Sequence, residues 1–445
     1  MAPTSASEKS TRIRYVVLAM IFIVSTLNYA SRATLSIAGP AASKQLGINA
    51  KQLGYLFSAF SWSYVIAQIP GGWLLDRFGS RNVYALSILF WSIFTFLQGY
   101  AALFTAGFAI VMFFSLRLLL GFAEAPAFPA NSRIVAAWFP ASERGTAAAI
   151  FNSSQYFATF LFAPLSGWIT ARYGWTWVFF VTGAMGIVVA GAWMKTVYSP
   201  ASHPRVSESE LKYIESGGAL VQMDKPASVV KANPGGGSQW AAMGQLLGNR
   251  MLLGVYLGQY CITTITTFFT TWFPVYLVQE RHMSILKAGF TASLPALCGF
   301  FGGILGGMFS DALLRTGRSL TVARKVPIVL GMLLSTSLIL CNFVASETMV
   351  VVIMSLAFLG KGIGALGWAV VADTSPKQIA GLSGGLFNMF GNATGIITPI
   401  VIGYIVDATH SYKGALIFVA ANAAVAILSY LFIVGEIKRV ELKSA

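Results

Sequence analysis

The sequence predicts an all-α membrane protein in which twelve transmembrane helices form two pseudo-symmetric six-helix bundles. Of its 445 residues, 56% are hydrophobic and only 10% are charged, whereas a soluble domain carries about 25% charged residues. Apolar runs of about 20 residues, long enough to cross a bilayer, recur along the whole chain. A polar stretch near the middle divides these runs into six and six.

The first six apolar runs lie near residues 15–38, 53–75, 82–104, 107–129, 145–170 and 174–197. The other six lie near 251–279, 288–313, 326–345, 348–372, 381–406 and 412–435. The first run is too long for a cleaved signal peptide and contains Asn28 and Arg32. We therefore expect a tail over 1–14, a first bundle over 15–198, a linker over 199–250, a second bundle over 251–436 and a tail over 437–445.

The central stretch predicts a linker with one short amphipathic surface helix. It contains Ser-His-Pro-Arg at 202–205, an acidic-basic helical pattern around Glu208–Glu215, and Asn-Pro-Gly-Gly-Gly-Ser at 233–238. Such a glycine-rich segment is typical of a flexible connection. No catalytic motif is visible in it.

The formal net charge is +15. We interpret the distribution of the Lys and Arg residues as the signal that orients the membrane helices, and not as a nucleic-acid-binding surface. If both termini are cytoplasmic, that side holds 21 of the 30 Lys and Arg residues, including Lys9 and Lys377, and the other side holds six. This asymmetry predicts cytoplasmic termini. Three isolated cysteines and three isolated histidines give no disulfide framework and no metal-ligand spacing, so we expect no metal site.

Two corresponding segments indicate an internal repeat. The second run ends in Gly72-Trp-Leu-Leu-Asp76-Arg77-Phe-Gly79-Ser-Arg81, and the eighth ends in Gly307-Met-Phe-Ser-Asp311, followed by Arg315, Gly317 and Arg318. Repeats of this kind are typical of two-bundle transporters. We expect Gly72 to permit close helix packing, and Asp76 and Asp311 to pair with basic groups and latch one conformation.

Ionisable residues inside membrane helices are candidates for a functional site. Arg32 shares a helix face with Asn28 and Tyr29, and Arg117 shares one with Glu124, seven residues later. One interpretation makes Arg117 and Glu124 a structural contact between helices. The other makes them a cavity-lining pair in which a guanidinium binds a substrate carboxylate and Glu124 accepts protons. The planar fork of arginine suits bidentate carboxylate binding.

Lys361 lies in the middle of the tenth run, seven residues before Trp368 and on the same face. One interpretation is structural, in that Lys361 pairs with a charge on another helix or extends to the membrane interface. The other is functional, in that Lys361, as part of the second bundle, binds a substrate carboxylate. In the last case Arg32 and Arg117 would hold the other end of the substrate, which favours a dicarboxylate about six carbons long.

A stripe of threonine hydroxyls and two asparagine amides either line the same cavity or simply pack between helices. These residues are Thr263, Thr266, Thr267, Thr270, Asn388 and Asn392.

The Gly72–Arg81 segment resembles the loop between helices 2 and 3 of the major facilitator superfamily. Further motifs resemble the anion:cation symporter family within it, and the resemblance covers all twelve runs. These motifs are Asn28-Tyr29-Ala-Ser31-Arg32-Ala-Thr-Leu-Ser, Gln68-Ile-Pro70-Gly-Gly-Trp73, Arg117-x3-Gly121-x2-Glu124-Ala-Pro126-Ala-Phe-Pro129, Ala137-Trp138-Phe139-Pro140, Thr271-Trp272-Phe273-Pro274 and Gly384-Gly-x-Phe387-Asn388. Within that family the chain is similar to bacterial proton-coupled permeases for hexarates and hexonates, especially the glucarate/galactarate type.

The resemblance implies roles for individual residues. Glu124 falls on the family's proton-coupling carboxylate in helix 4. The positions that the family uses to line its substrate site fall on Tyr29, Arg32, Tyr64, Gln155, Trp368 and Asn388. One position departs from the pattern, because the family has an aspartate, a second protonatable group, where this chain has Ser31. Serine does not titrate near neutral pH, so either fewer protons are coupled per substrate or the serine is a substitution that traps the protein.

These observations together predict a monomeric transporter in the bacterial inner membrane that takes up a sugar acid, glucarate or galactarate in the first place, by proton symport through alternating access. The alternative is an organic-anion uniporter or exchanger of hexonates without full proton coupling. An enzyme is not expected, because no nucleophile–base or metal constellation is visible, and no filter or charge ring indicates a channel. A sensor that no longer transports stays open because of Ser31. No cofactor is expected beyond the coupled proton.

Overall fold

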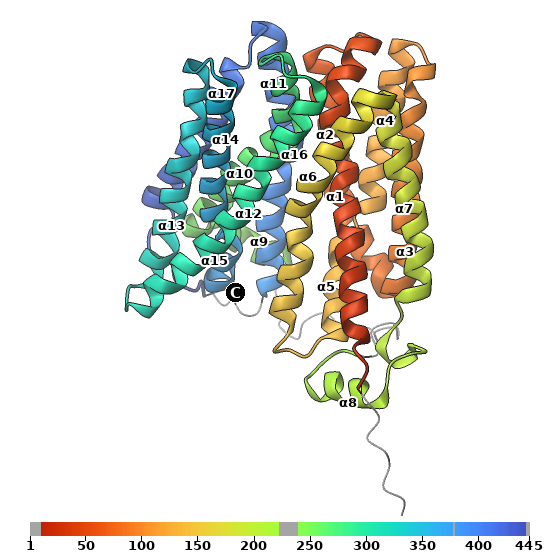
Figure 1. Cartoon of the computed structure of the whole chain (residues 1–445). Helices are drawn as coiled ribbons and strands as arrows, with labels where there is room; N and C mark the ends of the chain where they lie inside the picture. Colours follow the sequence, from red (N-terminus) through yellow and green to blue (C-terminus); the bar gives the residue numbers. More distant parts are fainter. Residues whose placement is uncertain (1–9, 222–238, 377–378, 442–445) are drawn as a thin grey trace, which may run out of the picture.

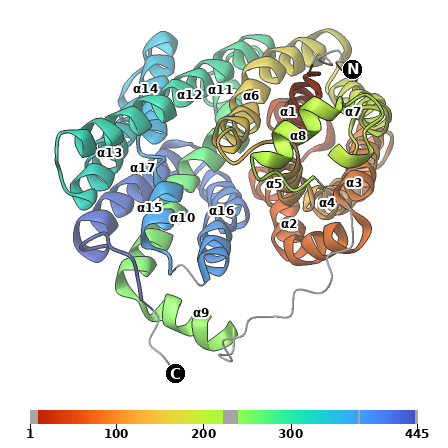
Figure 2. The same ribbon diagram turned by 90° about the horizontal axis from the view of Figure 1, so that it is seen from below.

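A computed structural model describes residues 10–221, 239–376 and 379–441, and within these ranges the chain forms helices and no β-strand. Long helices run side by side in two groups, one from each half of the sequence (Figures 1 and 2). The all-α fold predicted from the sequence is confirmed. Lys9, Lys377 and the segment 233–238 lie outside the described residues.

The first half contains α1 (Ile13–Leu46), α2 (Ala50–Phe78), α3 (Ser80–Gln98), α4 (Ala106–Glu124), α5 (Ala127–Trp138), α6 (Arg144–Tyr173) and α7 (Thr176–Thr196). The second half contains α10 (Arg250–Thr271), α11 (Phe273–Gln279), α12 (Ile285–Arg315), α13 (Leu320–Ser335), α14 (Glu347–Ile363), α15 (Gly367–Thr374), α16 (Ala380–Thr409) and α17 (Lys413–Leu428). Short 3-10 segments extend α3 and α13, and a π-helical segment extends α17. The two halves pack through α2 against α16 and α6 against α12.

Ten helices of the described chain are long and apolar enough to cross a membrane, which makes this a multi-pass membrane protein. Two more, α2 with 29 residues and α6 with 30, are as long as the others but are not among the ten. Both carry polar side chains that face the space between the halves, such as Gln68 and Gln155. The count of twelve crossings therefore stays a prediction.

Three of the predicted membrane runs are broken rather than continuous. The fourth run divides into α4 and α5 directly after Glu124, because Pro126 has no N–H to donate within the helix. The tenth divides into α14 and α15 two residues after Lys361, in a segment with Gly362, Gly364 and Gly367, and the seventh divides into α10 and α11. Discontinuous helices near the middle of a membrane protein expose polar backbone where a ligand site lies. Two of the buried charges thus lie beside helix breaks.

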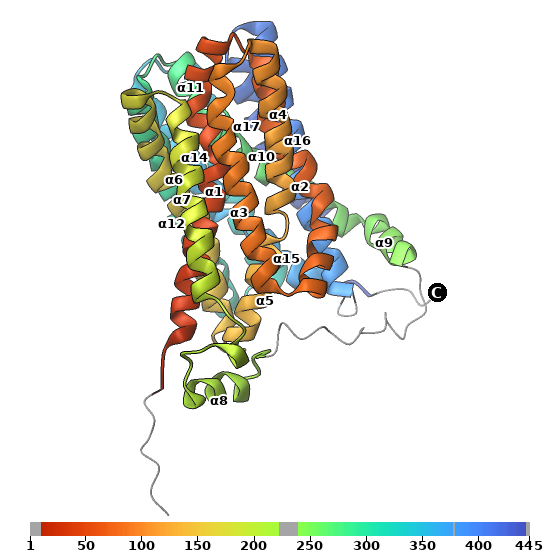
Figure 3. The same cartoon turned by 90° about the vertical axis from the view of Figure 1, so that its right-hand side faces the viewer.

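Both described chain ends and α8 (Glu208–Ser216) lie at one end of the molecule, which we call the linker end (Figures 1 and 3). The buried carboxylate of Glu210 accepts hydrogen bonds from the backbone N–H groups of Ile13 and Arg14, at 2.9 and 3.2 Å. It also forms an ion pair with the Arg14 guanidinium at 3.1 Å. A carboxylate at a helix N-terminus satisfies unpaired N–H groups and the helix dipole. The start of the linker is therefore attached to the first half. A further helix, α9 (Gln239–Gly248), was not predicted.

At the opposite end the two halves touch through glycines. A Cβ atom on Gly54 of α2 would lie 2.5 Å from the carbonyl oxygen of Pro399 in α16, and a Cβ on Gly289 of α12 would lie 2.6 Å from the carbonyl oxygen of Ala163 in α6. The hydroxyls of Tyr55 and Tyr404 lie 3.1 Å apart across the same α2–α16 contact. The halves are therefore closed together at the opposite end.

We expect Gly54→Ala to open this closed end, because its Cβ would meet backbone that cannot rotate away. Overpacking of this kind costs about 1–3 kcal/mol, and one or two kcal/mol shifts a two-state population by roughly 5- to 30-fold. A cysteine at Ser61, which lines the cavity near this end, should then react faster with a membrane-impermeant maleimide added at the opposite end. Gly307→Ala is the control, because its Cβ would meet no atom within 4 Å. Equal labelling in the two variants would contradict the prediction.

Candidate functional site

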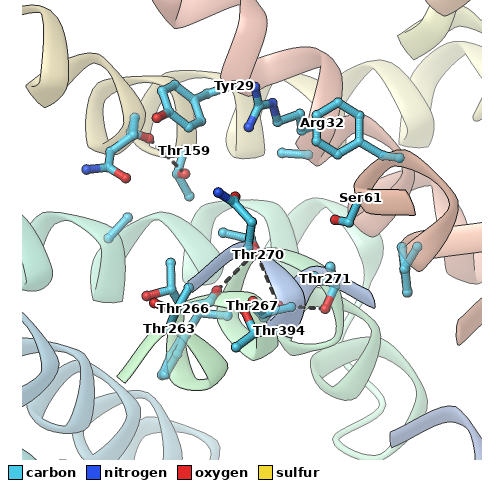
Figure 4. Close-up of a pocket in the computed structure, with 18 of the residues that line it drawn as sticks. Tyr29, Arg32, Ser61, Thr159, Thr263, Thr266, Thr267, Thr270, Thr271 and Thr394 are labelled. Carbon is cyan, nitrogen blue, oxygen red and sulfur yellow. Dashed lines mark hydrogen bonds between the residues drawn. The ribbon is translucent and has the colours of Figure 1, made fainter. Parts of the chain in front are cut away.

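A cavity of about 830 Å³ lies between the two halves and reaches residues of α5 and α15, which lie toward the linker end. A smaller cavity of about 280 Å³ adjoins it, and the two share lining residues such as Arg32, Gln155 and Thr263. In the smaller cavity Tyr29 and Arg32 of the first half face a group of threonines of the second half (Figure 4). The site is therefore built by both halves.

Seven of the eight residues predicted to bind substrate line the larger cavity. From the first half these are Tyr29, Arg32, Tyr64 and Gln155, and from the second half Lys361, Trp368 and Asn388. The eighth, Arg117, lines only the smaller cavity. Residues that lie more than 300 positions apart in the sequence are thus brought to one space.

Arg32 and Glu124 form the central ion pair of the first half. Arg32 Nε donates to Glu124 Oε2 at 2.7 Å, and Arg32 Nη2 donates to Asn28 Oδ1 at 2.9 Å. The Glu124 side chain is fully buried and the Arg32 side chain is 21% exposed. Glu124 lines neither cavity, so Arg32 stands between this carboxylate and the cavity.

Three aromatic rings surround the Arg32 guanidinium. Its Cζ lies 5.1 Å from the ring centre of Tyr29, 4.5 Å from that of Phe60 and 4.8 Å from that of Tyr64. Aromatic faces within about 6 Å attract a cation and leave its N–H groups free for other partners. The cage therefore holds the guanidinium at the cavity wall without neutralising its charge.

Ser31 contacts Glu124 directly. Its hydroxyl oxygen lies 2.8 Å from Glu124 Oε1 and 2.7 Å from the carbonyl oxygen of Asn28, and it donates its single proton to one of them at a time. Ser31 is 2% exposed. The position at which the chain departs from the family pattern is thus in hydrogen-bond contact with the buried carboxylate.

Lys361 lines the larger cavity from the second half and is 8% exposed. Its Nζ lies 5.4 Å from the ring centre of Phe358 and 5.9 Å from that of Tyr156, which belongs to α6 of the other half. Among the described residues no carboxylate oxygen lies within 4.0 Å of this ammonium. The alternative of a structural ion pair therefore finds no partner in the described chain.

Arg117 is 2% exposed, and its Nε and Nη1 atoms have no hydrogen-bond partner among the described residues. A buried charge whose polar atoms lack hydrogen-bond partners is costly. The wall of the smaller cavity thus carries a cation that an anion would stabilise.

Several polar residues of the cavity were not predicted from the sequence. Gln68, Asn152 and Gln259 line it, and Asn388 Nδ2 donates to Gln68 Oε1 of the other half at 3.5 Å. Their only signal was an amide side chain in an otherwise apolar run. All four threonines of the stripe, Thr263, Thr266, Thr267 and Thr270, line the smaller cavity, and Thr263 and Thr266 line the larger one as well. Thr267 also forms a hydrogen bond with Thr394 at 3.0 Å.

The expected latch residues form contacts within each half. Asp76 pairs with Arg133 of α5, while Arg77 lies against Trp73 and Phe78, and Arg81 donates to the carbonyl oxygen of Met194 at 2.6 Å. In the second half Arg324 of α13 pairs with Asp373 of α15 at 2.8 Å. Asp311 is exposed and forms no ion pair within the described residues.

The close helix approach expected at Gly72 lies instead at its neighbour. A Cβ on Gly71 would lie 3.2 Å from the backbone nitrogen of Pro126, whereas one on Gly72 would meet no atom within 4 Å. The helix rotation turns Gly71, not Gly72, toward the break between α4 and α5. The expectation for Gly72 is therefore wrong in this conformation.

Comparisons with known proteins agree with this architecture. The sequence profile of the Major Facilitator Superfamily matches residues 21–364. The chain is 62% identical over 442 residues to the probable galactarate/D-glucarate transporter GudP of Bacillus subtilis, covering 99% of this chain and 96% of that protein. It is 57% identical over 438 residues to the probable galactarate/D-glucarate transporter GarP of Escherichia coli, covering 98% of each. The resemblance to hexarate permeases is confirmed.

More distant proteins share the fold. The chain is 40% identical over 438 residues to a D-galactonate transporter of Escherichia coli, covering 98% of this chain and 99% of that protein. The structure also aligns with the inward-open conformation of the xylose transporter XylE from E. coli, with a TM-score of 0.70, 15% identity, and coverage of 97% and 98%. That structural likeness shows the fold alone.

Proposed function

The chain belongs to the major facilitator superfamily, and we propose that it takes up hexarates such as glucarate and galactarate by proton symport. In this proposal the linker end faces the cytoplasm of a bacterial cell. The cavity, which reaches α5 and α15 near that end, then represents the inward-open state of an alternating-access cycle.

The charge balance of the cavity is the observation that carries the substrate class. Arg32, Arg117 and Lys361 supply three positive charges, and Glu124 supplies one negative charge, among the described residues that line or border the two cavities. The site without ligand therefore holds two uncompensated positive charges while Glu124 is ionised, and three when Glu124 is protonated. A hexarate carries two carboxylates and compensates two of these charges, whereas a hexonate compensates one. The names of the relatives GudP and GarP support the same class.

The Arg32–Glu124 pair supplies the coupling in this proposal. A substrate carboxylate and the Glu124 carboxylate compete for the same guanidinium. A proton on Glu124 removes its charge and releases Arg32 toward the cavity, so protonation and substrate binding favour each other. By thermodynamic linkage the effect is reciprocal. Release of the substrate at the linker end then restores the ion pair and expels the proton.

The experiment that tests the proposed function is uptake of labelled glucarate into proteoliposomes with and without a pH gradient. We expect accumulation to require the gradient in the wild type and to be lost in Glu124→Gln, because glutamine cannot release a proton. Counterflow exchange of labelled for unlabelled glucarate should persist in that variant. Glu347→Gln, which changes an exposed carboxylate at the opposite end, is the control. Gradient-driven accumulation by Glu124→Gln would overturn the assignment of this residue.

Lys361 is expected to select hexarates over hexonates, because it is the cation that the second half offers to a second carboxylate. Lys361→Gln should weaken glucarate binding by more than about tenfold, since a desolvated charge pair contributes a few kcal/mol. Gluconate, with one carboxylate, should lose much less. Competition against one labelled substrate measures both, and Lys413→Gln, an exposed lysine, serves as the control. An equal loss for the two ligands would assign Lys361 a structural role.

Ser31→Asp is expected to raise the number of protons moved per substrate. The new carboxylate would lie beside Glu124. Two carboxylates at such a short distance are not both ionised, so one of them holds a proton. Ser31→Ala, which removes the hydrogen bond without adding an acid, is the matched comparison. Parallel measurement of charge movement and glucarate uptake gives the stoichiometry. The same value in wild type and Ser31→Asp would mean that Glu124 alone carries the coupling.

A further inference from the structure

Glu124 poses a problem of access for any proton that it exchanges. Its side chain is fully buried, it lines neither cavity, and Arg32 lies between it and the larger one. The charged groups that influence it are Arg32 of α1 and Arg117 of its own helix, and both repel a passing proton. A proton that left through the substrate cavity would have to pass the guanidinium of Arg32.

A second line of polar groups leads away from Glu124 inside the first half. On α1, Ser31, Asn28 and Ser25 follow one another at three-residue intervals and are all buried. Ser31 contacts Glu124 at 2.8 Å, and Ser25 Oγ accepts a hydrogen bond from Asn131 Nδ2 of α5 at 3.0 Å. The line therefore runs from the carboxylate toward the linker end.

The line continues on α3. The Tyr84 hydroxyl lies beside Ser25 and Asn131 without completing a hydrogen bond to either, and its ring packs against Trp193 at 4.6 Å. One turn earlier, buried Ser80 is the first residue of α3, next to the end of α2. There Asp76 exposes 70% of its side chain. The polar groups thus connect the centre of the first half with its linker end.

Three members of this line have polar atoms that lack a partner among the described residues, namely Asn28 Nδ2, Asn131 Oδ1 and the Tyr84 hydroxyl. Each of the three residues is at most 2% exposed. Buried polar groups of native proteins are almost always satisfied, and ordered water is the usual partner where side chains are not. Their occurrence along one line indicates places where water would complete a hydrogen-bonded chain.

We propose that Ser31, Ser25, Asn131 and Tyr84, with intervening water, form a proton route between Glu124 and the linker end that is separate from the substrate cavity. Hydroxyls and water accept a proton on one side and release another on the other side, while the asparagines orient the water. For each proton that Glu124 releases, one proton leaves at the linker end and the carboxylate becomes anionic. This inference rests on the proposed proton symport.

The route is tested by comparing net uptake with exchange. Net uptake requires Glu124 to release its proton in every cycle, whereas counterflow lets the loaded carrier shuttle with the proton in place. Tyr84→Phe keeps the ring contacts and removes only the hydroxyl. We expect it to slow gradient-driven glucarate uptake, and the proton flux reported by an internal pH dye, by at least about fivefold, and to leave counterflow at the wild-type rate.

Tyr430→Phe is the matched control, because Tyr430 is also fully buried with an unpartnered hydroxyl but lies in the second half. Ser25→Ala should behave like Tyr84→Phe. If Tyr84→Phe lowered uptake and counterflow equally, the hydroxyl would be structural and the route would be wrong. If gradient-driven uptake by Tyr84→Phe equalled that of the control Tyr430→Phe, the proposed route would also be wrong. Absence of pH-driven accumulation in the wild type would instead overturn the proposed symport, and the route with it.

Discussion

The ion pair between Arg32 and Glu124 is the interaction on which the rest of the site depends. It joins α1 to the end of α4 in the middle of the first half, and one partner is fully buried while the other borders the cavity. Burying a lone charge at this depth would be costly, and pairing it reduces that cost. The same pairing occupies the group best suited to bind a carboxylate. In the proposed function, stabilisation of the empty site by Glu124 and binding of an anionic substrate therefore compete for the Arg32 guanidinium.

The helix breaks explain why charge is tolerated at this depth. Glu124 ends α4 two residues before Pro126, and Lys361 lies two residues before the end of α14. At such breaks the backbone polar groups already require polar surroundings, so a charged side chain adds less to the cost of burial. The two breaks occur in corresponding helices of the two halves. The internal repeat suggested by the Gly–Asp–basic segments thus extends to where the halves place their charges.

Much of the fold follows from the sequence because the membrane imposes length and hydropathy on each helix. The sites of Arg32, Glu124 and Lys361 were visible for the same reason, since charge stands out in an apolar run. The helix break after Glu124 does not follow from the hydropathy pattern, because a single proline leaves the hydropathy of a continuous apolar run almost unchanged. The contact at Gly71 rather than Gly72 depends on helix rotation, which sequence spacing does not fix to within one residue.

Polar residues without charge were harder to interpret. Asn131, Ser25 and Tyr84 are each unremarkable in an apolar run, and only their convergence from α5, α1 and α3 gives them meaning. The same holds for Gln68, which meets Asn388 across the two halves. Their sequence separation, 320 positions in the latter case, exceeds anything that periodicity within one helix reports. Three-dimensional packing was needed to connect them.

In the proposed alternating-access cycle, closure of the cavity places a final constraint on the substrate. Arg32 belongs to the first half and Lys361 to the second, and the Lys361 ammonium lies 5.9 Å from the Tyr156 ring of the first half. If the halves close at the linker end as the proposal requires, water leaves and every uncompensated charge becomes more costly, because the effective dielectric constant falls. A ligand with an acid group at each end compensates a cation of each half and favours closure. A ligand with one acid group leaves a cation of one half unpaired, so the closed state discriminates more strongly than the open one.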